Sequence, residues 1–215
     1  MESSKPILLI LDPIEIRVLG SLMEKSKTTP EYYPLTLNAL MLACNQKSSR
    51  NPHVQYDEAT INSAINSLTK KGFVSTATGR GNRVRKYKHN FAIAYPDFTH
   101  SDMAVLCLLF LRGPLTPGEI NSNSARLYDF KSLEEVLKVL EKLKQGDSPF
   151  VAQLPRRAGQ KEQRFRHLFC EMQESNEEEL PEDPTKKLET RLEIVEKELA
   201  ELKSSVEKLL KEWMG

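Results

Sequence analysis

Side chains suited to nucleic-acid contact gather in the first 95 residues of the chain. A predicted helix over residues 57–71 presents outward groups that can bond base edges, and a predicted β-hairpin after it carries cations that can meet phosphates. A polar loop over residues 46–54 adds two more cations before the helix. The candidate nucleic-acid-binding residues are Lys47, Arg50, Thr60, Asn62, Ser63, Asn66, Lys70, Arg80, Arg83, Arg85 and Lys86.

Two acidic residues count against this interpretation, because Asp57 and Glu58 begin the helix that would approach the phosphates. Both also suit a structural role there, as an N-cap and as a partner of the helix dipole. No arginine lies on the exposed side of the helix, although arginine–guanine is the commonest specific base contact.

Net charge is distributed unevenly along the 215 residues. Residues 1–95 hold 13 Lys and Arg against 7 Asp and Glu, residues 96–170 hold 11 against 9, and residues 171–215 hold 7 against 14. A basic front can meet an anionic polymer, and an acidic rear can solvate the molecule or compete for the basic surface. The overall composition, 39% hydrophobic and 28% charged, is typical of a globular protein.

The elements that must position these residues are three helices followed by a β-hairpin. Asp12, Pro13 and Glu15 form a capping-box start, and the apolar spacing that follows predicts a half-buried helix. The predicted elements are helices from residue 12 to the TTPEYYP stretch at 28–34, over 35–45 and over 57–71, then strands over 73–77 and 83–90 around a turn at 79–82. This order is typical of a winged helix, a helix-turn-helix with a hairpin appended.

The same order repeats after about 80 residues. Helices are predicted over residues 101–111, around 119–125 and over 132–143, and the segment 163–169 corresponds to 85–91 of the first copy. We therefore predict an α+β fold, mainly α with small β-hairpins, built from two tandem winged-helix domains at residues 1–95 and 96–170. The third helix of the second copy exposes a mixed-charge face, so the first copy is the predicted DNA-binding domain.

The end of the chain differs in composition from the rest. Residues 171–185 form a predicted acidic linker, and residues 186–215 show a heptad pattern typical of a coiled-coil helix. Such a helix would pair two chains as a homodimer or bind a partner protein, although a lone amphipathic helix packing on its own domains gives the same pattern. The predicted oligomerisation residues are Leu188, Leu192, Val195, Leu199, Leu202, Val206 and Leu209.

One stretch carries a family resemblance. Residues 13–54, PIEIRVLGSLMEKSKTTPEYYPLTLNALMLACNQKSSRNPHV, and the following YDEATINSAI resemble the YceH-like bacterial proteins, a family of unknown function. The resemblance implies two winged-helix domains over roughly residues 10–170. It implies no particular activity.

Two functions fit these features. The first is a DNA-binding or transcription-associated protein whose first domain contacts double-stranded DNA, which requires the cations on one face. The alternative is an architectural protein–protein scaffold without direct DNA binding, which requires an exposed apolar patch instead.

Other classes are disfavoured. The sequence has no P-loop, HExxH, GxSxG or GxGxxG motif and its four histidines lack metal-ligand spacing, so we expect no enzyme, metal or cofactor. The longest apolar run, residues 103–111, is too short to span a membrane, and no signal peptide is recognisable, so a cytoplasmic protein is expected. Cys44, Cys107 and Cys170 are expected to be buried apolar thiols.

Two local features remain open in the sequence. The polar run at residues 45–51 could line a small anion or ligand pocket, or could order the entry to the helix at 57–71. Tyr32 and Tyr33 could stack on a base or a partner side chain, or could cap the core.

Overall fold

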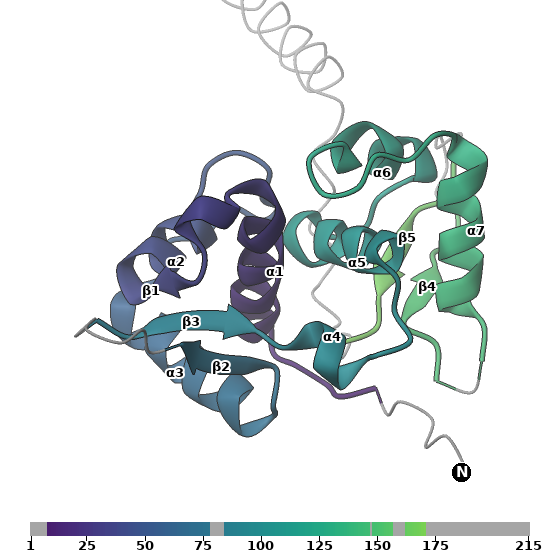
Figure 1. Ribbon diagram of the computed structural model, residues 1–215. Coiled ribbons are helices and arrows are strands. Elements are labelled where there is room, and N and C mark those ends of the chain that lie inside the picture. Colours follow the sequence, from purple (N-terminus) through teal and green to yellow (C-terminus); the bar gives the residue numbers. More distant parts are fainter. Residues whose placement is uncertain (1–7, 78–83, 147, 157–161, 171–215) are drawn as a thin grey trace, which may run out of the picture. The chain divides into compact units, whose positions relative to one another are not determined.

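The computed structural model describes residues 8–77, 84–146, 148–156 and 162–170, all within one compact unit, Met1–Glu171 (Figure 1). The first half holds α1 (Pro13–Thr28), the 3-10 turn η1 (Pro30–Tyr32), β1 (Leu35–Thr36), α2 (Leu37–Cys44), α3 (Glu58–Lys70), β2 (Val74–Ala77), β3 (Lys86–His89) and α4 (Phe91–Ala94). The second half holds α5 (His100–Arg112), α6 (Pro117–Ser124), α7 (Leu133–Lys144), β4 (Val151–Gln153) and β5 (Phe165–His167). The predicted mixed fold, mainly helical with small antiparallel sheets, is confirmed.

Local sequence sets the helix starts. Asp12 caps α1 by accepting hydrogen bonds from the backbone N–H groups of Ile14 and Glu15, and the Glu15 carboxylate reaches back to the Asp12 N–H, so the predicted capping box is confirmed. Thr99 and Thr116 form the same box at α5 and α6. Each box satisfies backbone donors that a helix start leaves without partners.

The strands of the two halves pair in a related way. In the first half β3 lies between β1 and β2, with Leu35 opposite Tyr87. In the second half β4 pairs with β5, and Leu115 makes an isolated bridge to Phe165 where the first half has β1. The hairpin of each half therefore gains a third segment from the start of its second helix.

The core continues from one half to the other through α1. This helix packs against α2 and α3 on one side and α5 on the other (Figure 1). The prediction of a half-buried α1 is wrong, because every residue from Glu15 to Met23 is buried. Gly20 permits the close approach of α5, and the Cys107 thiol lies 3.5 Å from the Gly20 carbonyl oxygen.

Aromatic rings fill the space between the first hairpin, α4 and the end of the second half. Phe91 contacts Phe73, Tyr95, Phe110 and Phe169 with centroid separations of 5.0–6.2 Å. Such contacts add to the stabilisation from apolar burial. Cys44 and Cys107 are buried, as expected, and Cys170 is half-buried.

Replacing Gly20 with valine is expected to lower the free energy of unfolding by about 1–3 kcal/mol, because extra methyl groups overpack a close helix crossing. A Cβ at Gly20 would lie 3.0 Å from both Phe110 Cβ and Leu111 Cδ2. Gly118→Ala is the control, since its Cβ would meet nothing closer than 3.7 Å. Denaturant unfolding measures all three proteins, and equal stability of Gly20→Val and wild type would contradict the tight α1–α5 crossing.

Candidate nucleic-acid interface

Helix α3 divides cleanly into a buried and an exposed side. Ile61, Ala64, Ile65 and Leu68 are buried, as the apolar spacing predicts. The predicted base-reading residues lie on the opposite side, where Asn62, Ser63, Asn66 and Lys70 are exposed and Thr60 is half-buried. Between Ala59 and Lys70 this helix carries no acidic residue.

Two contacts hold the ends of α3 in place. At its start, the Asn45 side chain donates to the Tyr56 carbonyl oxygen at 2.8 Å and accepts from the Tyr56 N–H at 2.9 Å, which closes the loop before the helix. At its end, Lys71 donates to the buried Glu15 carboxylate at 2.7 Å. Burial opposes ionisation of Glu15, but this bond and those from Ser67 and the Asp12 backbone hold its pKa below the usual value.

Arg50 does not lie on this face, and its predicted role as a phosphate ligand is wrong. Its side chain has no exposed surface and makes a bidentate pair with Glu24, at 3.0 Å to Oε1 and 2.6 Å to Oε2. The remaining donors reach the carbonyl oxygens of Ala43 and Ser49 and the side chain of Gln46. A guanidinium with all its donors engaged in the interior cannot also meet a phosphate.

The loop at residues 45–57 is anchored by a second buried arginine. Arg17 donates to the Pro52 carbonyl oxygen at 2.6 Å and to that of Cys44 at 3.3 Å. The Asn51 N–H donates to the Leu111 carbonyl oxygen, and Arg112 donates to Ser49 Oγ at 2.9 Å, so the loop also binds α5. These contacts support the interpretation that the polar run orders the entry to α3, while Gln46, Ser48 and Ser49 also line a pocket, as the other interpretation expected. Lys47 is exposed.

The described part of the hairpin carries three cations. Arg85 and Lys88 are exposed and Lys86 is half-buried, whereas Tyr87 between the two lysines is buried. Alternate residues of a strand share a face, so Lys86 and Lys88 point the same way. Lys88 was missing from the predicted set, although the alternation with Tyr87 is the signal that would have found it. Arg80 and Arg83 lie outside the described residues.

Known bacterial proteins resemble this chain over most of its length. The family described as "Protein of unknown function, DUF480" matches residues 11–160. The chain belongs to this family. It is 43% identical over 208 residues to a UPF0502 protein of Shewanella sp. strain ANA-3, covering 91% of this chain and 95% of the relative. It is also 43% identical over 206 residues to a UPF0502 protein of Pectobacterium carotovorum, covering 93% and 98%.

The acidic start of α3 in this DUF480 chain has a structural role. Asp57 is the N-cap and accepts from the Thr60 N–H at 2.8 Å, and the bonds from Thr60 lower the pKa of Asp57. Its charge is thus partly offset by the backbone donors of the first turn. Glu58 remains exposed and would repel a phosphate.

The second half of the DUF480 chain presents a different face. On α7, Glu135 accepts from the Tyr128 hydroxyl and the Lys131 N–H, and Lys142 pairs with the buried Asp102. Leu133 and Leu137 on the same helix are 43% and 44% exposed. The described face of α7 is therefore a mixture of paired charges and apolar groups.

The two tyrosines of the TTPEYYP stretch differ in their hydrogen bonding and exposure. The Tyr33 hydroxyl accepts from the His89 N–H at 2.7 Å, and the residue packs against the core. Tyr32 is 72% exposed.

Among the described residues, no group of three or more His, Cys, Asp or Glu side chains could hold a metal ion, and no described helix has the length and apolar character to cross a membrane.

Proposed function

We propose that this protein binds double-stranded DNA through α3 and the β2–β3 hairpin, in the manner of a winged-helix protein. The observation that carries the proposal is the exposed side of α3, where uncharged polar groups and Lys70 follow the first turn without a carboxylate. Asn62 and Asn66 offer amide groups of the kind that bond adenine, and Ser63 can bond several bases.

Cations before α3, in its last turn and in the hairpin after it supply the phosphate contacts in the proposal. Lys47 precedes the helix, Lys70 lies in its last turn, and Arg85, Lys86 and Lys88 come from the hairpin. Arg80 and Arg83 extend the hairpin set as predicted contacts. Arg50 is excluded, and its role is to fix the loop before α3. Phosphate contacts of this kind give affinity without sequence preference, and the helix side chains would supply specificity.

The proposal is tested by a salt titration of binding to random-sequence duplex DNA. Arg85→Gln, Lys86→Gln and Lys88→Gln are combined in one variant, and Arg126→Gln, Lys131→Gln and Lys138→Gln form a control with the same change of charge on the second half. The hairpin variant should bind more weakly at low salt, and its log–log salt slope should be shallower by about 0.9 for every phosphate that the substitutions leave without a cation. The control should keep most of the wild-type slope.

Either of two results would overturn DNA binding at this site. One is negligible wild-type binding at ~50 mM salt, where phosphate contacts are strong. The other is an equal reduction of affinity in the hairpin variant and its control, which would mean that only net charge matters.

A protein–protein scaffold is the second candidate. The exposed Leu133 and Leu137, four residues apart on α7, favour it because residues at this spacing share a helix face. If the protein did not bind DNA, the proposed functional surface would be this face of α7. In both versions the heptad from Leu188 to Leu209 remains the proposed oligomerisation segment, and it lies outside the described residues.

A further inference from the structure

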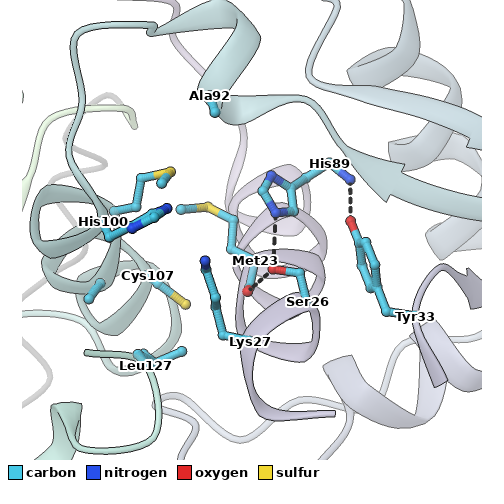
Figure 2. Close-up of a pocket in the computed structure, with 11 residues that line it drawn as sticks. Met23, Ser26, Lys27, Tyr33, His89, Ala92, His100, Cys107 and Leu127 are labelled. Carbon is cyan, nitrogen blue, oxygen red and sulfur yellow. Dashed lines mark hydrogen bonds between the residues drawn. The ribbon is translucent and has the colours of Figure 1, made fainter. Parts of the chain in front are cut away.

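A cavity of about 310 Å³ opens beside the crossing of α1 and α5 (Figure 2). The first half contributes residues from α1, Tyr33, His89 at the end of β3 and Ala92 in α4. The second half contributes residues from α5 and Leu127. Its volume lies at the lower end of the range for ligand pockets, roughly 300–1,000 Å³, which suits a small molecule.

Most of the wall is apolar. Met23 and Met103 face the cavity with Ala104, Cys107 and Leu127, and Figure 2 shows the thioether of Met23 lying between the rings of His89 and His100. Thioether side chains adapt readily to the shape of an apolar ligand. The Cys107 thiol is buried, and burial raises its pKa, so it contributes to the wall as a neutral apolar group.

The hydrogen bonds of His89 fix one neutral tautomer. Its Nδ1 accepts from the Phe91 N–H at 3.3 Å, so the ring proton resides on Nε2 and is donated to Ser26 Oγ at 3.1 Å. Ser26 Oγ in turn donates to the Met23 carbonyl oxygen at 2.7 Å. The donor groups of His89 and Ser26 are thereby used within the protein.

Tyr33 and Lys27 each bring to the cavity a donor that no described residue uses. The Tyr33 hydroxyl oxygen accepts from the His89 N–H, and its own proton has no acceptor among the described residues. Lys27 makes no ion pair with any described residue, and Figure 2 shows its amino group directed into the space between Cys107 and Ser26. The lining includes no carboxylate, so the field inside is positive.

We propose that this cavity binds a small monocarboxylate with an apolar body, its carboxylate held by Lys27 and its body lying against Met23 and Met103. One cation matches the single charge of a carboxylate. A phosphate dianion would leave a charge without a partner among apolar walls. The proposal goes beyond DNA binding and its test uses no DNA.

Methyl-labelled methionine provides a direct test with salicylate as the probe. The whole chain has six methionines; Met23 and Met103 line the cavity, and Met41 packs elsewhere on α2. Nuclear magnetic resonance of the ¹³C-methyl groups during a salicylate titration should show saturable shifts of Met23 and Met103, with Met41 unchanged. No shift up to about 10 mM, or an equal shift of Met41, would overturn the site, since a millimolar dissociation constant is only ~4 kcal/mol of binding.

Matched variants then test the recognition. Lys27→Gln should weaken salicylate binding about tenfold or more, because it removes a charge-assisted contact. Lys138→Gln, an exposed lysine of α7 outside the cavity, should leave binding unchanged. Salicylamide, which keeps the ring but lacks the charge, should bind the wild type at least as weakly as salicylate binds Lys27→Gln.

A filling substitution guards against misfolding as the cause of weaker binding. Ala92→Leu enlarges an exposed residue at the rim of the cavity, so the fold should tolerate it while the cavity shrinks. An unchanged Met41 methyl signal in both variants reports an intact fold. Wild-type affinity in Lys27→Gln and in Ala92→Leu would show that salicylate binds somewhere else and would overturn the proposal.

Discussion

Replacing Arg50 with methionine is expected to lower the free energy of unfolding by about 3–5 kcal/mol, because it leaves a buried partner charge uncompensated. The Glu24 carboxylate is 15% exposed and, among the residues that the structure describes, would keep only Lys25, at 3.4 Å, as an ion-pair partner. The Ala43 carbonyl oxygen and the Gln46 side chain would each be deprived of a donor. Denaturant unfolding followed by circular dichroism measures the change in stability.

Two comparisons separate this effect from simple charge removal. Lys47→Met, in the same loop but exposed, should change stability by less than about 0.5 kcal/mol. Glu24→Gln combined with Arg50→Met should recover part of the stability, because no buried charge remains without a partner. A double variant less stable than the sum of the two single changes would argue against the pair as the source.

The pair also sets a pH dependence. Burial opposes the ionisation of Glu24, but the hydrogen bonds and charge of Arg50 hold its pKa below the usual value. A carboxyl whose pKa is lower in the folded than in the unfolded chain stabilises the folded state at pH values above the unfolded-state pKa. This contribution is lost as the pH falls through the folded-state pKa. In Arg50→Met the pKa of the Glu24 carboxyl should rise, because only the weaker effects of Lys25 would still oppose burial, and the pH dependence should become smaller.

Acidification from pH 6.5 to pH 4 is expected to destabilise the protein through its two buried histidines, by on the order of 3 kcal/mol each. Burial lowers the pKa of His89 to about 4, with help from the charge of Lys27, and burial with Arg166 lowers the pKa of His167 to about 4. The unfolded chain therefore binds more protons between pH 4 and pH 6.5. Stability rises with pH across this window and falls on acidification.

His167→Leu isolates one of the two contributions. The His167 ring packs edge-on against Phe110 at 4.9 Å, and its buried Nδ1 has no hydrogen-bond partner among the described residues, so leucine should cost little stability at neutral pH. Denaturant unfolding at several pH values should show roughly half of the histidine-dependent slope removed. A pH profile identical to that of the wild type would mean that His167 is not neutral and buried in the folded protein.

The sequence predicted most elements because their signals are local. The capping box of Asp12 and Glu15, the apolar stripe of α3 and the strand alternation around Tyr87 all depend on residues within a few positions of each other. Boundaries shifted where the chain changes element: the helix predicted over 35–45 begins at Leu37, because Leu35–Thr36 pairs with β3 as β1. The short helix α4 was not predicted.

Contacts between distant residues were beyond a single sequence. Arg50 stands among polar loop residues, which is typical of a surface cation, and nothing local indicates that Glu24, 26 residues earlier, lies beside it in the interior. The second buried face of α1 was missed for the same reason. Apart from Ile16, the buried residues outside the predicted stripe are Glu15, Arg17, Gly20 and Ser21, which are not apolar side chains, so no hydrophobic period marks them.

Leu11, just before α1, donates its N–H to the carbonyl oxygen of Phe169 at 2.7 Å, so the first and last described segments are fastened to each other. During synthesis the ribosome releases the chain from its N-terminus, at about 5–20 residues per second. The first half must therefore wait roughly 4–15 s for Phe169 after Tyr95 has been made. For roughly the first 1–3 s of that interval, until α5 has been made, the side of α1 that later meets α5 is unpaired and exposed to chaperones and to neighbouring nascent chains.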